Sequence, residues 1–231
     1  MAGWRAIGII GGMGPAATAD FLGRLVVGVG AGTDEDNPRF FVDSNPDIAD
    51  RNAARAGQGP SPGPALAAMA RGLALAGAEV LAMPCNAAHG WADDIIAATP
   101  LPSISMIDAA VAAAAALQPK RIGVIAVGAT LDARLYHAPL EALGIGVIDC
   151  DRSIVQPLVT AIKAGDTGPA IRAAMAAEAA RLVAAGADAV IAACTEVPLV
   201  LGEKDVTVPF IDATAALVAA VLAAARRDRA A

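Results

Sequence analysis

The chain repeats one order of sequence segments, and this repeat constrains the fold more than any other feature. GAEVLAMPCNAAH begins at Gly77 and GADAVIAACTEVP begins at Gly186, an offset of 109 positions (186 − 77) that also carries Cys85 onto Cys194. Upstream, AIGIIGGMGP pairs with RIGVIAVGAT; downstream, LPSISMIDA pairs with TVPFIDA. Self-similarity at a fixed offset indicates repeated structural units. We therefore expect two pseudo-symmetric lobes related by a pseudo-twofold axis.

Each half alternates short apolar segments with alanine-rich segments of helical length. Continuous apolar strands that alternate with helices indicate buried parallel sheets, and hence an α/β fold. The expected strands are residues 6–12, 39–44, 79–84 and 101–107 in the first half, and 121–127, 144–150, 189–194 and 208–212 in the second. The expected helices are residues 17–29, 63–78, 107–117, 171–187 and 213–227.

The repeat also predicts where the lobes begin and end. With 231 residues, the chain is long enough for one large domain or two small ones. The segment VPFID corresponds to SISMID, which leads from the first half into the second, so the final helix is expected to return to the first lobe. This predicts a first lobe of residues 1–100 plus 212–231 and a second lobe of residues 101–211, with the active site in the cleft between them.

Charge and cysteine content exclude several functional classes. The formal net charge of −6 argues against nucleic-acid partners, which need a basic surface, and gives no reason to expect binding to anionic membranes. The longest apolar runs are shorter than the ~20 residues of a membrane-spanning helix. Three cysteines without a CxxC motif fit a reducing compartment, and the N-terminal residues lack a signal-peptide layout. We therefore expect a cytoplasmic protein.

Two of the three cysteines occupy equivalent and chemically favourable positions. Cys85 and Cys194 each end an expected strand, just before an expected helix start, where parallel sheets form their ligand crevice. A single free cysteine is most often a small buried apolar residue. A repeat-related pair, each followed by a polar residue (Asn86 and Thr195), instead favours a shared function. Cys150 has no counterpart in the first half and is expected to be structural.

Two opposed thiols suit inversion at a carbon atom. The N–H groups at a helix start favour thiolate, so one cysteine could remove a proton from one face of a substrate. The other thiol could return a proton on the opposite face, and the reverse reaction would use the same groups in exchanged protonation states. Racemisation calls for this geometry. A metal site would need more ligands at suitable spacing than the chain offers, so no metal is expected.

The motifs that carry these residues resemble a known family. GIIGGMGPAAT, PDIADR, MPCNAAH, ATLDARLY, IKAG and ACTEVPL occur in order over nearly the whole chain. Together they resemble the aspartate/glutamate racemase family, and especially its aspartate-racemase branch. The resemblance implies amino-acid racemisation without pyridoxal phosphate or another cofactor, with Cys85 and Cys194 as the two acid/base residues. It also implies a homodimer with a small-molecule amino-acid substrate.

The resemblance further implies which residues bind the substrate. Arg51 in PDIADR would hold an acidic side chain, since arginine can grip a carboxylate with two hydrogen bonds. Lys163 in IKAG would add positive charge at the site. Glu196 would orient the substrate amine or cap the following helix. The other expected substrate-binding residues are Met13, Gly14, Asn86, Ala87, Thr130 and Thr195.

Some positions leave the substrate open. Ala87 stands where the family usually carries threonine, so a hydroxyl expected near the substrate carboxylate is missing. Aspartate or glutamate is the expected substrate. One alternative is another racemase or isomerase of the superfamily, acting on a hydantoin or a related carboxylic acid. A second is a non-catalytic small-molecule binding module, since fold alone does not determine function. His89 is expected to support the site from outside catalysis.

Overall fold

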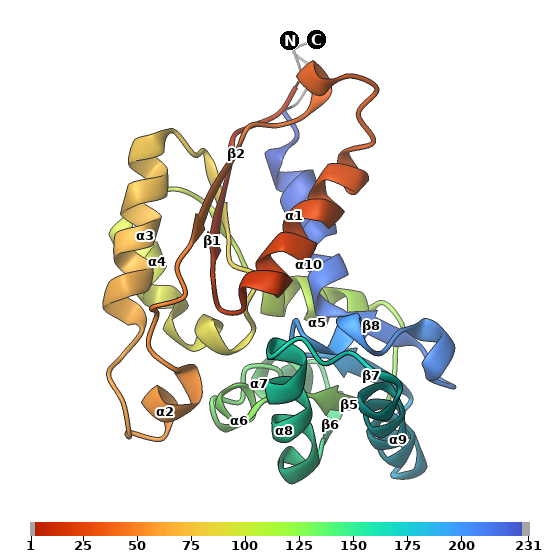
Figure 1. The fold of residues 1–231 in the computed structure, drawn as a ribbon. Helices are drawn as coiled ribbons and strands as arrows, with labels where there is room; N and C mark the ends of the chain where they lie inside the picture. Colours follow the sequence, from red (N-terminus) through yellow and green to blue (C-terminus); the bar gives the residue numbers. More distant parts are fainter. Residues whose placement is uncertain (1–2, 228–231) are drawn as a thin grey trace. The chain divides into compact units, whose positions relative to one another are not determined.

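The computed structural model describes residues 3–227, which form two compact units (Figure 1). The first unit comprises the residues up to Met106 together with those from Leu217 onward, and the second unit comprises Ile107–Ala216. The second lobe expected from the repeat, residues 101–211, thus begins six positions earlier (107 − 101) and ends five positions earlier (216 − 211) than the second unit.

Each unit contains one four-stranded parallel sheet, which confirms the predicted α/β class. The strand orders are β2-β1-β3-β4 and β6-β5-β7-β8, so the two sheets have equivalent topology. The strands of the first unit are β1 Ile7–Gly11, β2 Phe40–Ser44, β3 Val80–Ala82 and β4 Ser103–Ile104. Those of the second unit are β5 Arg121–Ile125, β6 Gly146–Asp149, β7 Ala189–Ala192 and β8 Phe210–Asp212. All eight lie within the predicted segments.

Helices cover the sheets. In the first unit, α3 and α4 lie on one side of the sheet, and α1 and the later part of α10 on the other (Figure 1). The five helices expected from the sequence are α1 Pro15–Val29, α3 Gly63–Ala76, α5 Met106–Ala115, α9 Pro169–Ala184 and α10 Ala213–Ala225. The sequence patterns did not predict α2 Arg51–Arg55, α4 Ala92–Ala98, α6 Gly128–Asp132, α7 His137–Ala142 and α8 Arg152–Lys163. Short 3-10 helices are η1 Asp34–Asp36, η2 Ala87–Trp91, η3 Val197–Leu199 and η4 Glu203–Asp205.

Strand register follows the sequence repeat. Gly8 of β1 pairs with Leu81 of β3, and Gly123 of β5 pairs with Val190 of β7. Leu81 and Val190 differ by the same 109 positions (190 − 81) that relate the two cysteines. The two halves therefore align residue by residue at the strands that lead to Cys85 and Cys194.

Helix packing repeats in the same way. A Cβ atom added at Gly8 would lie 3.3 Å from Cβ of Leu73 in α3, and one added at Gly123 would lie 2.9 Å from Cβ of Leu182 in α9. Leu73 and Leu182 are again 109 positions apart (182 − 73). In both units, the helix before the cysteine-bearing strand thus rests directly on a glycine of the first strand.

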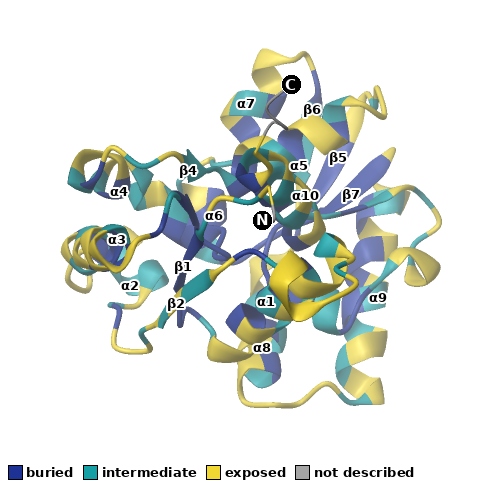
Figure 2. Ribbon diagram, turned by 90° about the horizontal axis from the view of Figure 1, so that it is seen from above, coloured by how far each residue is buried: buried dark blue, intermediate teal, exposed yellow. Residues whose placement is uncertain are grey.

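Burial is concentrated at the central strands. Strands β1, β3 and β7 are buried along their whole length, whereas the edge strands β2 and β6 are largely half-buried or exposed (Figure 2). Aromatic residues make up only 3% of the chain, so the cores consist mainly of aliphatic side chains. Within residues 3–227, no helix has the length and apolar character needed to span a membrane.

We expect the substitution Gly123→Ala to destabilise the protein, because the new methyl group meets the backbone-proximal Cβ of Leu182 inside a packed core. Overpacking of this kind costs about 1–3 kcal/mol. Gly72→Ala is the matched control: Gly72 lies exposed within α3 with no neighbouring atom within 4 Å of an added Cβ. It should raise stability by about 0.5–1 kcal/mol, because alanine favours helix. Calorimetric melting temperatures that fall or rise together in both variants would contradict this packing.

Candidate active site

A tight turn follows β1, and close packing and hydrogen bonds fix the backbone conformation around Met13 and Gly14. Gly12 has φ of 93°, and a side chain there would overlap the main chain of Asn45 in the loop after β2. The Gly12 N–H donates to Oγ1 of Thr18 (2.9 Å), and that hydroxyl donates to the Gly14 carbonyl (3.1 Å). Met13 is buried and Gly14 caps α1. Both expected contacts therefore lie at the carboxyl end of β1.

Cys85 emerges from the neighbouring strand of the same sheet. Strand β3 ends at Ala82, and the Cys85 N–H donates to the Met83 carbonyl (2.8 Å), which turns the chain towards η2. Cys85, Asn86 and Ala87 are all buried. The three expected site residues of this segment thus follow β3 directly, beside the end of β1.

His89 holds the main chain at Cys85. Its Nδ1 lies 2.8 Å from the Cys85 carbonyl oxygen, and its Nε2 lies 3.0 Å from the N–H of Met106, the first residue of α5. Both contacts are with main-chain atoms, and a supporting role of His89 outside catalysis stays a prediction. The sequence feature that indicates the first contact is the spacing of four residues, because it allows the imidazole ring to reach the Cys85 carbonyl.

Arg51 is the first residue of α2, in the segment after β2. Its Nη1 donates to the carbonyls of Ile48 (3.2 Å) and Ala49 (2.9 Å) in its own loop. Asp50 caps the helix by accepting from the Ala53 N–H (2.8 Å), and α2 contacts η2. The guanidinium has five N–H donors, so donors remain for a carboxylate. A substrate contact by Arg51 stays a prediction.

In the second unit, four of the expected residues form one group, of which Cys194, Thr195 and Glu196 are buried and Lys163 is exposed. The Cys194 thiol donates to Oε2 of Glu196 (3.0 Å), and the Thr195 hydroxyl donates to the same oxygen (3.2 Å). Lys163, the last residue of α8, places its Nζ 3.9 Å from Oε1 of Glu196. Only 3% of Glu196 is exposed, whereas the Lys163 side chain is 39% exposed. The three buried residues follow β7, and Lys163 approaches them from the end of α8.

The surroundings of Cys194 favour the neutral thiol. Burial raises the pKa of Cys194 well above its ordinary value, and the negative charge of Glu196 raises this pKa further, while Lys163 lowers it. The main-chain N–H of Glu196 lowers the pKa of Cys194, as expected at a helix start, but burial and the Glu196 carboxylate outweigh this contribution. The segment that follows is a three-residue 3-10 helix, too short to oppose burial and a neighbouring carboxylate.

Two further residues lie near this group. Thr130 of α6 follows β5, the neighbour of β7, and its hydroxyl is buried without a hydrogen-bond partner within residues 3–227. Tyr136 is fully buried, and burial raises its pKa, with further increases from the charges of Cys194 and Asp212. Tyr136 is the last residue of the ATLDARLY motif and the only tyrosine of the chain, and the sequence pattern does not indicate a role for it.

Cys150 differs from the other two cysteines. Its Sγ accepts from the N–H of Ala126 (3.3 Å) and donates to the carbonyl of the same residue (3.3 Å). Burial raises the pKa of Cys150 to about 11. Both of these hydrogen bonds of the thiol go to main chain, which fits the structural role expected for Cys150.

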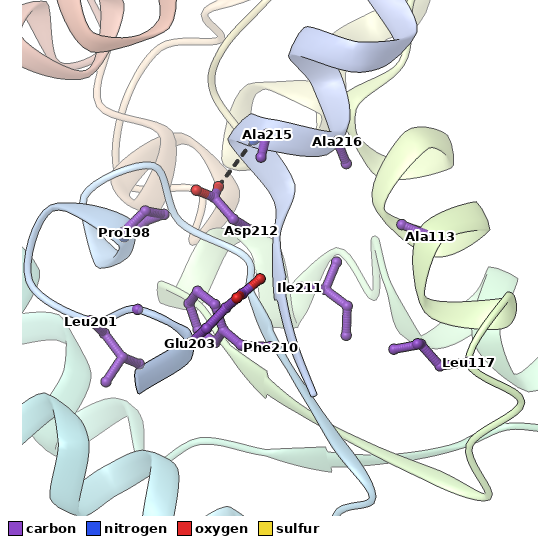
Figure 3. A pocket seen from close by; sticks show the side chains of 11 residues that line it. Ala113, Leu117, Pro198, Leu201, Glu203, Phe210, Ile211, Asp212, Ala215 and Ala216 are labelled. Carbon is purple, nitrogen blue, oxygen red and sulfur yellow. Dashed lines mark hydrogen bonds between the residues drawn. The ribbon is translucent and has the colours of Figure 1, made fainter. Parts of the chain in front are cut away.

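A pocket of about 460 Å³ in the second unit is separate from these groups (Figure 3). Its carboxylates come from Glu203 and Asp212, and Asp212 already accepts from the N–H groups of Thr214 (2.7 Å) and Ala215 (3.1 Å). Its lining contains none of the predicted site residues. Within residues 3–227, no group of three or more His, Cys, Asp or Glu side chains is arranged to hold a metal ion.

The protein thus consists of two α/β units of equivalent topology. Each unit carries a buried cysteine beyond an inner strand of its parallel sheet. The sequence model described as Asp/Glu/Hydantoin racemase matches residues 10–221. The chain therefore belongs to the Asp/Glu/hydantoin racemase family.

Individual relatives agree with this assignment. The chain is 27% identical over 219 residues to the broad specificity amino-acid racemase RacX of Bacillus subtilis, covering 91% of this chain and 94% of that protein. The solved aspartate racemase of Picrophilus torridus is 29% identical, with a TM-score of 0.87 and coverage of 95% of this chain and 94% of that chain. Glutamate racemase of Francisella tularensis, solved with D-glutamate, shares the fold at 19% identity, a TM-score of 0.68, and coverage of 95% and 80%.

We expect Glu196→Gln to lower the pKa of Cys194, because the amide removes the negative charge that opposes thiolate formation. Lys163→Met should have the opposite effect and raise this pKa, because it removes the nearby positive charge. Iodoacetamide labelling of Cys194 as a function of pH, followed by peptide mass spectrometry, measures both shifts. Cys150 in the same samples is the internal control. Shifts of equal sign in the two variants would contradict the described electrostatics.

Proposed function

We propose that this protein is a cofactor-independent racemase that interconverts the enantiomers of aspartate or glutamate, with Cys85 and Cys194 as its two proton-transferring residues. One observation carries the proposal: each repeat-related cysteine lies directly beyond an inner strand of its own parallel sheet, at the edge where such sheets bind ligands. In the proposed site, the two cysteines face opposite sides of one substrate carbon.

The proposed reaction begins with one cysteine as thiolate and the other as thiol. The thiolate takes the proton from the α-carbon, so a C–H bond breaks and an S–H bond forms. The thiol on the opposite face then gives its proton to the same carbon, so that S–H bond breaks and a new C–H bond forms. The configuration is inverted and the total number of protons is unchanged. The reverse reaction exchanges the two roles.

Glu196 gives the Cys194 half of the site a proton acceptor. The thiol already donates to Oε2 at 3.0 Å, so transfer of this proton to the carboxylate would generate the thiolate without a change of partner. Lys163 Nζ lies 3.9 Å from the other carboxylate oxygen, Oε1. The role of proton acceptor is an alternative to binding of the substrate amine by Glu196.

An acidic substrate is supported by the cationic side chains. Lys163 lies beside the Cys194 group, and the Arg51 helix contacts the segment after Cys85. The α-carboxylate would accept hydrogen bonds from the buried Thr130 hydroxyl, from Asn86, and from Thr195 if its hydroxyl turns away from Glu196. The turn at Met13 and Gly14 would contact the substrate through its backbone. The 29% identical aspartate racemase agrees with this substrate class, while the similarity to RacX favours a panel that includes neutral amino acids.

Two other functions give different experimental results. A racemase or isomerase for a hydantoin or related carboxylic acid would exchange the hydrogen of that compound but of no amino acid. A binding module would bind its ligand without any exchange, and the retention of both cysteines argues against it. The expected homodimer and cytoplasmic location stay predictions.

We expect Cys85→Ser and Cys194→Ser each to reduce racemisation by at least about 10²-fold, because serine preserves the packing but is a far weaker base near neutral pH. Each variant should still exchange the α-hydrogen of one enantiomer with solvent, and the favoured enantiomer should differ between them. Polarimetry and proton NMR in deuterated water, with aspartate, glutamate and neutral amino acids, measure both activities.

Cys150→Ser is the matched control and should retain most of the activity, because Cys150 contacts only the Ala126 main chain in the hydrogen bonds described above. Full racemisation by either the Cys85 or the Cys194 variant would contradict the proposed mechanism. Loss of activity in all three variants would indicate a general sensitivity to thiol replacement.

A further inference from the structure

The two hydrogen bonds of His89 determine which ring nitrogen carries the proton. The Met106 main-chain N–H can only donate, so Nε2 at 3.0 Å is the acceptor and carries no hydrogen in the neutral ring. The proton of the neutral imidazole is therefore on Nδ1, which donates to the Cys85 carbonyl at 2.8 Å. Both partners are main-chain atoms, so the ring links two segments of backbone.

These two segments are the continuations of neighbouring strands. Pairing between β3 and β4 ends at Ala82 and Ile104, and Pro84, which follows, has no N–H to continue it. Beyond this point, the His89 ring connects Cys85 on the β3 side with Met106 on the β4 side. The imidazole thus replaces a missing connection at the position where Cys85 leaves the sheet.

In the second half of the repeat, the carbonyl of the equivalent cysteine is bound without an imidazole. The residue 109 positions after His89 is Pro198 (89 + 109), whose side chain has no hydrogen-bonding atom. There, the Cys194 carbonyl accepts instead from the main-chain N–H of Val197 (3.0 Å). The histidine contact is therefore specific to the Cys85 half and is not a general requirement of this turn.

We propose that His89 is a positioning residue for Cys85: as the Nδ1–H tautomer, it fixes the Cys85 carbonyl against the start of α5 and so orients the thiol. It does not exchange protons with the substrate, because both ring nitrogens are engaged with main chain. The tests that measure hydrogen exchange of each enantiomer rest on the proposed function, whereas the NMR and thiol-labelling tests do not.

The tautomer is tested without reference to activity. The chain has two histidines, so ¹⁵N NMR of the labelled protein gives two imidazoles, and His137→Asn identifies the signal of His89. At about pH 8, above the ordinary pKa of histidine, we expect His89 to be protonated on Nδ1 alone. Protonation on Nε2, or a mixture of the two tautomers, would overturn the inference.

The positioning role is tested with three substitutions at one site. His89→Ala removes both hydrogen bonds. His89→Asn places an amide nitrogen near the position of Nδ1, so it keeps the hydrogen bond to the Cys85 carbonyl and loses the one from Met106. His89→Gln places an amide oxygen near the position of Nε2, so it keeps the hydrogen bond from the Met106 N–H and loses the one to Cys85. We expect hydrogen exchange of the enantiomer handled by Cys85 to fall about tenfold or more in the alanine and glutamine variants, with KM little changed. The asparagine variant should recover most of this loss.

The other enantiomer supplies the internal comparison. Its proton abstraction by Cys194 should change far less, so the ratio of the two exchange rates should shift. A purely structural role would lower both rates together, and that result, or unchanged rates for both enantiomers in His89→Ala, would overturn the proposal. His137→Asn is the matched control: it removes a histidine paired with Asp149 in the second unit and should leave the ratio unchanged.

A separate measurement distinguishes failure of this inference from failure of the racemase proposal. Iodoacetamide labelling reports the surroundings of each thiol even if no substrate is turned over. We expect His89→Ala to change the labelling rate of Cys85 severalfold, with the rates at Cys150 and Cys194 unchanged. Unchanged labelling of Cys85, or an equal change at all three cysteines, would overturn the positioning role whatever the outcome of the activity assays.

Discussion

The parallel pairing of β3 with β1, and of β7 with β5, determines where the two repeat-related cysteines, Cys85 and Cys194, leave their sheets. Each pairing requires a glycine on the first strand, because the preceding helix brings a leucine within contact distance of the position a side chain would occupy. The helices and strands therefore approach closely enough to bury the central strands completely. Beyond the last paired residues the chain stays buried, and polar side chains such as Asn86, Thr195 and Glu196 appear there. The site residues of each unit gather at that edge.

Equivalent scaffolds support the two cysteines in different ways. The side chain of Cys194 donates to Glu196, and the position 109 residues earlier is Ala87 (196 − 109), which has no polar side chain. The Cys85 segment is held through its carbonyl by His89, whose counterpart is a proline. The two halves of the repeat thus place their thiols at equivalent positions in the fold, but different residues contact the two cysteines.

The sequence predicts the strands well because buried parallel strands are continuous apolar runs, and the repeat tests each assignment twice. It does not predict helices such as α2 and α6, which are five residues long and show no periodicity. The sequence also does not predict the 12-residue helix α8, because Pro157 lies in its interior and one of its faces is polar. The contact of Glu196 with Cys194 depends on the direction of a side chain, which no spacing reveals. Burial and that carboxylate also outweigh the contribution of the helix start to the pKa of Cys194.

The central claim is that two different groups act on opposite faces of one carbon, and isotope incorporation in the wild-type protein tests it most directly. A single enantiomer of aspartate or glutamate is incubated in deuterated water, and deuterium at the α-carbon is measured at early times in product and in remaining substrate. With two bases, the product should carry solvent deuterium while the remaining substrate keeps its original hydrogen. Deuterium that enters the remaining substrate as fast as the product would indicate one base and contradict the account.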